Sequence, residues 1–307
     1  MTSFKHDFLK NMLNAMSIPM YWKLPPVNHL RNILETSTMF STLPWGVTFE
    51  KIDYDLFSAE WLVPREAVSD RVILYLHGGG YVIGSSHTHR ALAGSIAKGV
   101  GASCLVIDYR KAPENPYPAA LDDAFHAYNQ LLDTGYKADH IAVVGDSAGG
   151  GLSIALQYEL RDLGLPLPRC TVLLSPYLDL NGTGRSVSLN AKNDRFLDVF
   201  EMRRWAEMYA GDQDFKDPLI SPLYGNTKGL PPILVQASES EVLYDDSVRF
   251  VKKARQSGVD IEFQTWHGLI HWWHMFGTMP EAKEAIGKVI EFINLRFAGI
   301  GNSTAEE

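Results

Sequence analysis

Apolar residues along this chain gather in short runs, and the segments between the runs show helical periodicity. Residues 72–76 and 104–107 are almost continuously apolar, which is typical of strands buried on both faces of a sheet. Residues 47–53 and 59–63 alternate more between apolar and polar side chains, which predicts an antiparallel edge. The predicted strands cover residues 47–53, 59–63, 71–77, 103–109, 141–145, 171–175, 233–237 and 261–266.

Helices are predicted between most of these strands. They cover residues 89–99, 119–133, 150–163, 244–257 and 281–297. The alternation of strand and helix indicates an α/β fold, with a mostly parallel, eight-stranded sheet and helices on both faces. A chain of 307 residues suits one large unit of this class.

Two segments do not fit the alternation: residues 1–45 and residues 181–216. Their notable apolar side chains are Phe8, Met12 and Met16 in the first, and Phe196, Trp205, Met208 and Tyr209 in the second. Insertions in an α/β sheet commonly cover the site beyond the carboxyl ends of the strands. We therefore expect a helical cap of residues 1–45 and 181–216, a catalytic domain of residues 46–180 and 217–300, and a polar tail of residues 301–307.

Composition and charge narrow the range of partners. The net charge is −8 and no cluster of Lys and Arg is present, so no nucleic-acid partner is expected. No apolar stretch reaches the ~18 residues of a transmembrane helix, and the polar start is unlike a signal peptide, so no membrane association is expected. Cys104 and Cys170 lie near the starts of apolar runs. They are expected to be buried free thiols in a reducing cytoplasm.

A candidate nucleophile lies in the sequence Gly-Asp-Ser-Ala-Gly at residues 145–149, which follows a predicted strand and opens a predicted helix. Such a strand-to-helix turn can present the hydroxyl of Ser147 in a strained corner. A serine hydroxyl attacks at neutral pH only when a base takes its proton. Ser147 could instead merely cap the helix, but partner residues of the required types follow in the order acid, then histidine.

The base is expected on the loop after the last strand, where His267, His271 and His274 are candidates. His271 is favoured because His267 ends the strand and His274 falls in the following helical turn. After the seventh strand come the candidate acids Glu239, Glu241, Asp245 and Asp246. Glu241 is favoured for its position early in the turn, because Asp245 and Asp246 begin a helix whose N-terminus attracts carboxylates.

An oxyanion hole is expected from the sequence His-Gly-Gly-Gly at residues 77–80, because glycines let backbone N–H groups approach a carbonyl oxygen closely. The amide of Ala148 would add a further donor. Trp205, Tyr209 and Trp272 are candidates for the substrate pocket, with core packing as the alternative. His87 and His89 do not make a convincing metal pair, and no nucleotide-binding motif is present, so neither a metal nor a cofactor is expected.

These motifs resemble the hormone-sensitive-lipase-like family of α/β-hydrolases, the bacterial type IV carboxylesterases. The resemblance covers about residues 70–275 and rests on residues 77–80, 108–114, 118–123, 145–150, 217–218 and 221–224. It implies Ser147 as nucleophile, His271 as base, and Gly79, Gly80 and Ala148 as oxyanion donors. Many members carry aspartate at the acid position, whereas Glu241 stands here.

The same resemblance implies a two-part helical cap, a small, apolar, short-chain ester as substrate, no cofactor and a possible homodimer. Two other functions stay open from the sequence. Amide or acetyl-ester deacetylation would use the same residues with a different leaving group. A non-catalytic ligand-binding relative would be expected to have a broken triad, whereas candidates for all three residues are present here.

Overall fold

One mixed sheet organises the chain. The computed structural model describes residues 2–3, 6, 25–38, 42–194 and 196–298. The strands are β1 (Val47–Asp53), β2 (Ser58–Pro64), β3 (Val68–Leu76), β4 (Ala102–Asp108), β5 (Ile141–Asp146), β6 (Cys170–Leu174), β7 (Ile233–Ser238) and β8 (Ile261–Trp266). Their order in the sheet is β1-β2-β4-β3-β5-β6-β7-β8. Strand β2 runs antiparallel to β1 and β4, and the other neighbours are parallel, as the sequence predicted.

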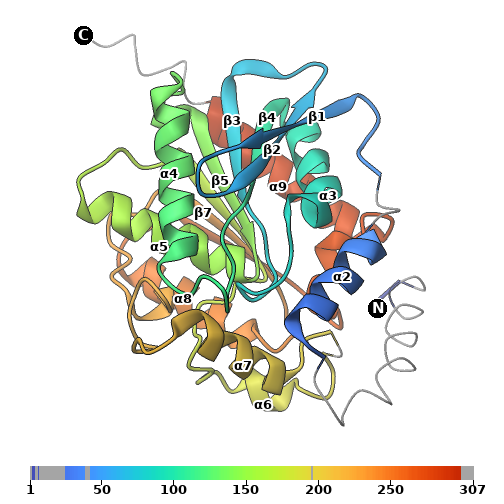
Figure 1. The fold of residues 1–307 in the computed structure, drawn as a ribbon, viewed down its shortest axis with the longest axis vertical. Helices are drawn as coiled ribbons and strands as arrows, with labels where there is room; N and C mark the ends of the chain where they lie inside the picture. Colours follow the sequence, from blue (N-terminus) through green and yellow to red (C-terminus); the bar gives the residue numbers. More distant parts are fainter. Residues whose placement is uncertain (1, 4–5, 7–24, 39–41, 195, 299–307) are drawn as a thin grey trace.

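Helices cover both faces of this sheet (Figure 1). They are α2 (Val27–Thr38), α3 (Ser86–Val100), α4 (Ala119–Asp133), α5 (Ala148–Asp162), α6 (Ser186–Leu189), α7 (Val199–Ala210), α8 (Tyr244–Gln256) and α9 (Pro280–Ala298). Helix α3 begins at Ser86, earlier than the predicted residue 89. The side chain of Ser85 caps it by accepting a 3.1 Å hydrogen bond from the Thr88 amide, and the Thr88 hydroxyl accepts a 2.9 Å hydrogen bond from the Ser85 amide.

The central strand β3 explains why residues 72–76 are almost continuously apolar. Its side chains at Val72, Leu74 and Leu76 join the core cluster that includes residues of α4 and α5. The intervening Ile73 and Tyr75 join the cluster that includes residues of α3 and α9. Both faces are therefore buried, which removes the polar alternation expected of a half-exposed strand.

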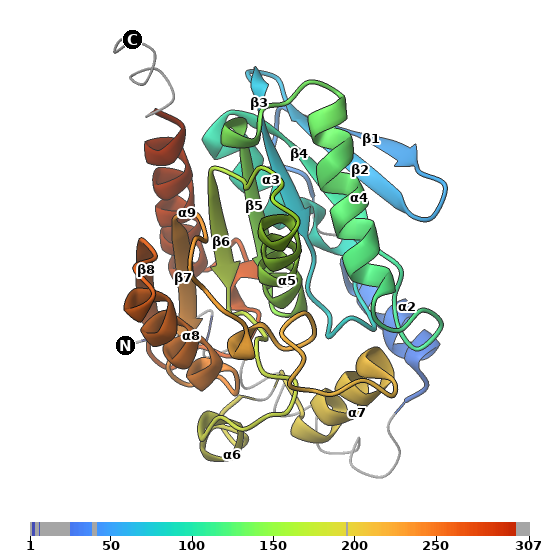
Figure 2. The same cartoon turned by 90° about the vertical axis from the view of Figure 1, so that its left-hand side faces the viewer.

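The carboxyl ends of the parallel strands meet at one end of the molecule, where α6 and α7 lie (Figure 2). These two helices belong to residues 181–216, and α2 belongs to residues 1–45. The two segments meet where the Arg204 side chain donates a 3.5 Å hydrogen bond to the carbonyl of Pro25. Phe8, Met12, Met16 and the predicted tail at residues 301–307 lie outside the described residues. Within the described ranges, no helix combines the length and apolar character needed to cross a membrane.

Candidate active site

Ser147 lies on the sharp turn between β5 and α5. Its backbone adopts φ +50° and ψ −119°, a conformation that a non-glycine residue rarely takes. The turn is held from both sides, because the Ser147 amide donates to Leu174 O (2.9 Å) and its carbonyl accepts from the Tyr177 amide (2.8 Å). A Cβ atom at Gly149 would overlap the carbonyl of Leu76. The motif therefore keeps glycine where α5 crosses the end of β3.

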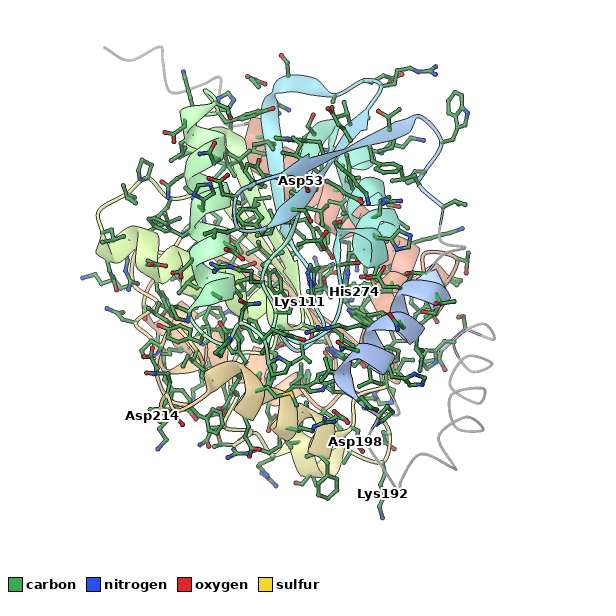
Figure 3. The ribbon with its side chains drawn as sticks, viewed as in Figure 1. Asp53, Lys111, Lys192, Asp198, Asp214 and His274 are labelled. Atoms are coloured by element: carbon green, nitrogen blue, oxygen red, sulfur yellow. The ribbon has the colours of Figure 1, made fainter. Side chains whose placement is uncertain are left out.

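The structure brings His271 to this serine. His271 Nε2 lies 3.0 Å from Ser147 Oγ, and the two side chains are buried. The other two candidate histidines are engaged elsewhere. His267 is exposed and lies 3.1 Å from the Glu239 carboxylate. His274 is enclosed in the protein interior (Figure 3) and stacks on Trp273 with ring centroids 3.8 Å apart. Burial lowers the pKa of His274 to about 3.

Glu241 is the carboxylate that contacts His271. Its Oε2 lies 2.8 Å from His271 Nδ1, and its Oε1 accepts a 2.9 Å hydrogen bond from the Ser238 amide. With Nδ1–H donated to Glu241, His271 presents the lone pair of Nε2 to the hydroxyl of Ser147. Burial lowers the pKa of His271, but the hydrogen bond and charge of Glu241 and the charges of nearby aspartates outweigh it, so the net shift is upward.

The alternative acids each have another partner. Glu239 contacts His267 and the hydroxyl of Thr265. Asp245 accepts a 3.1 Å hydrogen bond from the Ser186 amide. Asp246 accepts hydrogen bonds of 2.9 Å from the amides of Leu178 and Asp179. None of these three carboxylates contacts a candidate histidine other than the exposed His267.

The buried Asp246 makes folding stability depend on pH. Burial and then the charge of Asp179 raise the pKa of Asp246 to about 8. Between its unfolded and folded pKa values the native state binds the extra proton, so the free energy of unfolding falls as pH rises from about 4 to 8. Asp246→Asn removes this pH dependence. Between about pH 4 and 8, the free energy of unfolding of the variant should therefore rise relative to that of wild type by about 1 kcal/mol per pH unit.

Urea unfolding of wild type and Asp246→Asn across this pH range measures the effect. Asp245→Asn is the matched control, because it removes the adjacent carboxylate, which is only partly buried. If the free energy of unfolding had the same pH dependence in wild type and Asp246→Asn, the raised pKa of Asp246 would be contradicted.

The glycine loop after β3 provides candidate oxyanion donors. Gly79 and Gly80 have φ +116° and +61°, values that favour glycine. In the part of the chain that the structure describes, the amides of Gly79, Gly80 and Ala148 donate to no protein acceptor. These three N–H groups are the candidate donors to an oxygen of a bound substrate.

Asp146 joins the oxyanion loop to the loop that carries His271. Its carboxylate accepts hydrogen bonds from the Gly78 amide (3.1 Å), the Tyr75 hydroxyl (2.8 Å) and the Trp272 indole (2.6 Å). Burial raises the pKa of Asp146, but the neighbouring His89 and these hydrogen bonds outweigh it, so the net pKa is well below the usual value. The sequence places Asp146 only at the variable position of the motif, although a carboxylate next to the candidate nucleophile is a signal that could point to such a role.

The three predicted pocket residues have different surroundings. Trp205 on α7 packs so closely against Gly80 that a Cβ atom there would overlap its ring. Tyr209 is buried and stacks on Tyr81, with ring centroids 3.7 Å apart. Trp272 is 6% exposed and is held by its bond to Asp146. Trp205 thus lies against a candidate oxyanion glycine.

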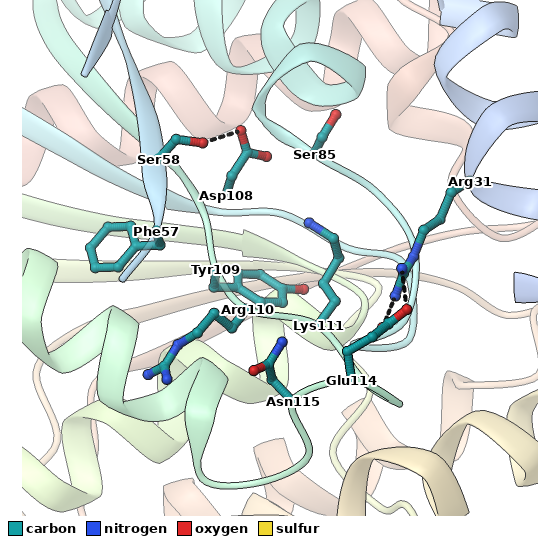
Figure 4. A pocket seen from close by; sticks show the side chains of 10 residues that line it. All are labelled: Arg31, Phe57, Ser58, Ser85, Asp108, Tyr109, Arg110, Lys111, Glu114 and Asn115. Atoms are coloured by element: carbon teal, nitrogen blue, oxygen red, sulfur yellow. Dashed lines mark hydrogen bonds and ion pairs between the residues drawn. The ribbon is translucent and has the colours of Figure 1, made fainter. Parts of the chain in front are cut away.

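A cavity of about 590 Å³ is lined by residues from α2, from the ends of β2 and β4, and from the segment after β4 (Figure 4). Its lining includes Arg31 from α2, whose guanidinium donates to the carbonyls of Val82 and Ala112 (each 2.8 Å) and pairs with Glu114. The Lys111 amino group is directed into the cavity, and burial is the main cause of its lowered pKa. Ser147, His271 and Glu241 do not line this cavity. One lining residue contacts the glycine loop, because the Tyr109 hydroxyl donates a 2.8 Å hydrogen bond to the carbonyl of His77.

A family model described as the alpha/beta hydrolase fold matches residues 73–275, which is most of the chain. The chain belongs to this α/β-hydrolase family.

Individual relatives of this α/β-hydrolase show which group within the family it resembles. It is 40% identical over 230 residues to an acetyl-hydrolase of Streptomyces hygroscopicus, covering 75% of this chain and 77% of the relative. It is 35% identical over 296 residues to an esterase of Acinetobacter venetianus, covering 95% and 96%. A crystal structure of an esterase from the bacterial hormone-sensitive lipase family superposes with a TM-score of 0.91 at 38% identity, covering 97% of this chain and 99% of the other. These findings confirm the resemblance to the bacterial hormone-sensitive-lipase-like group.

Proposed function

We propose that this α/β-hydrolase hydrolyses short-chain carboxylic esters through an acyl-enzyme intermediate on Ser147. The observation that carries the proposal is the chain of contacts from Ser147 Oγ to His271 Nε2 (3.0 Å) and from His271 Nδ1 to Glu241 Oε2 (2.8 Å). A hydroxyl, a base and an acid in this order make up the catalytic triad of serine hydrolases.

The reaction proceeds in two halves. Ser147 Oγ attacks the ester carbonyl carbon while His271 Nε2 takes the hydroxyl proton, and the amides of Gly79, Gly80 and Ala148 receive the developing oxyanion. The tetrahedral intermediate collapses, the bond to the alcohol breaks, and the leaving alcohol takes the proton from His271. Water then attacks the acyl-enzyme with His271 as base, which releases the carboxylic acid and restores Ser147. Glu241 stabilises the imidazolium in both halves.

The relatives support the chemical class. They are named acetyl-hydrolase and esterase, and one is an ethyl acetate hydrolase. The sequence-based prediction of a carboxylic ester hydrolase is thereby confirmed. The intact triad geometry favours an enzyme over a non-catalytic ligand-binding relative.

Several further features complete the proposal. We propose residues 1–45 and 181–216 as the cap segments over a catalytic domain of residues 46–180 and 217–300; the cap helices that the structure describes are α2, α6 and α7. Trp205 on the cap helix lies against Gly80, which limits the room beside the oxyanion and favours small, apolar acyl groups. The two buried free thiols, Cys104 and Cys170, support a reducing, cytoplasmic location. Strand β8 ends the sheet, and we propose that its outer edge forms a homodimer contact.

A panel of p-nitrophenyl esters tests this function. We expect turnover of the acetate and butyrate esters and a steep loss with the laurate ester. An organophosphate should inactivate the enzyme with one adduct, found by mass spectrometry on the peptide that contains Ser147. Absence of ester hydrolysis, or an adduct on another residue, would contradict the proposal.

A further inference from the structure

The loop that carries His271 is held by side chains. Residues 267–271 make no backbone–backbone hydrogen bond to any described residue. Their backbone groups bond instead to Ser240 Oγ (Gly268 N, 3.0 Å), Ser238 Oγ (Leu269 O, 2.7 Å), His6 Nε2 (Ile270 N, 3.3 Å) and Asp194 Oδ1 (His271 N, 3.1 Å). Of these four contacts, the one from Asp194 holds the histidine itself.

Asp194 also holds the turn that carries Glu241. Its second carboxylate oxygen, Oδ2, accepts a 3.0 Å hydrogen bond from the amide of Val242, the residue after Glu241. One carboxylate thus bonds the backbone of the base and the backbone beside the acid. Asp194 is 2% exposed and lies in the segment between α6 and α7.

A neighbour on the same segment strengthens this link. The Asn190 side chain donates to the carbonyls of Glu239 (3.0 Å) and Glu241 (2.9 Å). The carbonyl of Asn190 accepts a 2.9 Å bond from the Asp194 amide, which fixes the two residues relative to each other. Residues 190–194 therefore contact the acid turn at successive backbone groups.

The charge of Asp194 acts on His271 as well. The groups that face His271 are Glu241 after β7, Asp194 after α6, Asp146 at the end of β5, and His274 on its own connection. Burial raises the pKa of Asp194, and although the charge of His271 and the amide bond from Val242 oppose this effect, the net shift is upward. The negative charges of Glu241, Asp194 and Asp146 favour protonated His271. Removing the charge of Asp194 therefore lowers the pKa of His271.

We propose that Asp194 is a positioning residue for ester hydrolysis, through which the cap segment fixes the base loop and the acid turn in one geometry. The inference rests on the proposed function of Ser147, His271 and Glu241. It differs from a general structural role, because a carboxylate that only stabilises the cap would not change the titration of the histidine.

Asp194→Asn tests the proposal with the smallest change in shape. The amide keeps one acceptor but turns an NH₂ group toward the amide of either His271 or Val242, so one of the two bonds is lost. We expect kcat to fall about 100-fold with little change in KM, because small displacements of reacting groups cost about this much. We also expect the acidic limb of the kcat/KM profile to move to lower pH.

Asp198→Asn is the matched control. Asp198 also lies in residues 181–216 and also accepts two amide bonds, from Phe200 (2.9 Å) and Glu201 (3.0 Å), but it is exposed. Its variant should keep the wild-type kcat and pH profile. Equal losses in the two variants, or a wild-type kcat and acidic limb in Asp194→Asn, would overturn the proposal.

Two measurements without substrate separate this inference from the proposed function. NMR titration of ¹³C-labelled histidine should show a lower pKa of His271 in Asp194→Asn, whether or not any ester is hydrolysed. If Ser147-dependent hydrolysis is present and this titration is unchanged, the positioning role is wrong. If Asp194→Asn does not fold, hydrogen exchange of the backbone amides in wild type tests the positioning role instead. The amides of His271 and Val242 must be protected, and exchange at the rate of exposed loop amides would overturn the role.

Discussion

Ser147→Ala is expected to lower kcat for p-nitrophenyl butyrate by about 10⁶-fold, the loss typical of removing the nucleophile of a serine hydrolase. The reason is that the variant has no oxygen at the position 3.0 Å from His271 Nε2, so no acyl-enzyme can form. Slow residual turnover is still expected, because the candidate oxyanion donors Gly79, Gly80 and Ala148 would still polarise a bound ester.

The measurement is steady-state hydrolysis together with reaction with an organophosphate. The midpoint of thermal unfolding should be close to that of wild type, because alanine keeps the Cβ atom and the backbone conformation of the turn. Wild-type turnover in Ser147→Ala would place the chemistry on another residue. Loss of activity with loss of folding would be resolved by Ser147→Cys, which retains a nucleophile at the same position.

Glu241→Gln is expected to give the second largest loss, about 10⁴-fold in kcat. The glutamine side chain can present an NH₂ group to His271 Nδ1, which then accepts a hydrogen bond and carries its proton on Nε2. In that tautomer Nε2 cannot accept the proton of Ser147. Loss of the carboxylate charge also lowers the pKa of His271, so the acidic limb of the remaining activity should move to lower pH.

Asp245→Asn is the control for this prediction. It removes a carboxylate from the same connection, but that carboxylate bonds the Ser186 amide and does not contact His271. Its pH–rate profile should overlay that of wild type. A larger loss of kcat in Asp245→Asn than in Glu241→Gln would show that Glu241 is not the catalytic acid. The comparison is made as kcat and kcat/KM over the full pH range, with circular dichroism to verify folding.

The sheet and the nucleophile turn could be predicted from the sequence because each depends on local residues. Buried strands such as β3 need apolar side chains on both faces, and the turn at Ser147 needs glycine at Gly149. The start of α3 was placed late because Ser85 caps the helix with a side chain that periodicity does not register. Spacing alone could order His267, His271 and His274 only by preference.

The contacts that complete the site could not be predicted in the same way. Asp146 bonds Tyr75, Gly78 and Trp272, and Asp194 bonds His271 and Val242. These partners are between 48 and 126 positions away along the chain, so no periodicity relates them. Trp272 was predicted as a pocket residue, and only the structure shows its indole committed to Asp146.

The side-chain support of residues 267–271 has a consequence for heat inactivation. A loop without a backbone ladder can open in a local fluctuation that leaves the sheet folded. Each such opening separates the histidine from the serine and interrupts turnover. We therefore expect activity to be lost at a temperature set by the free energy of this one short segment, below the temperature at which the core unfolds.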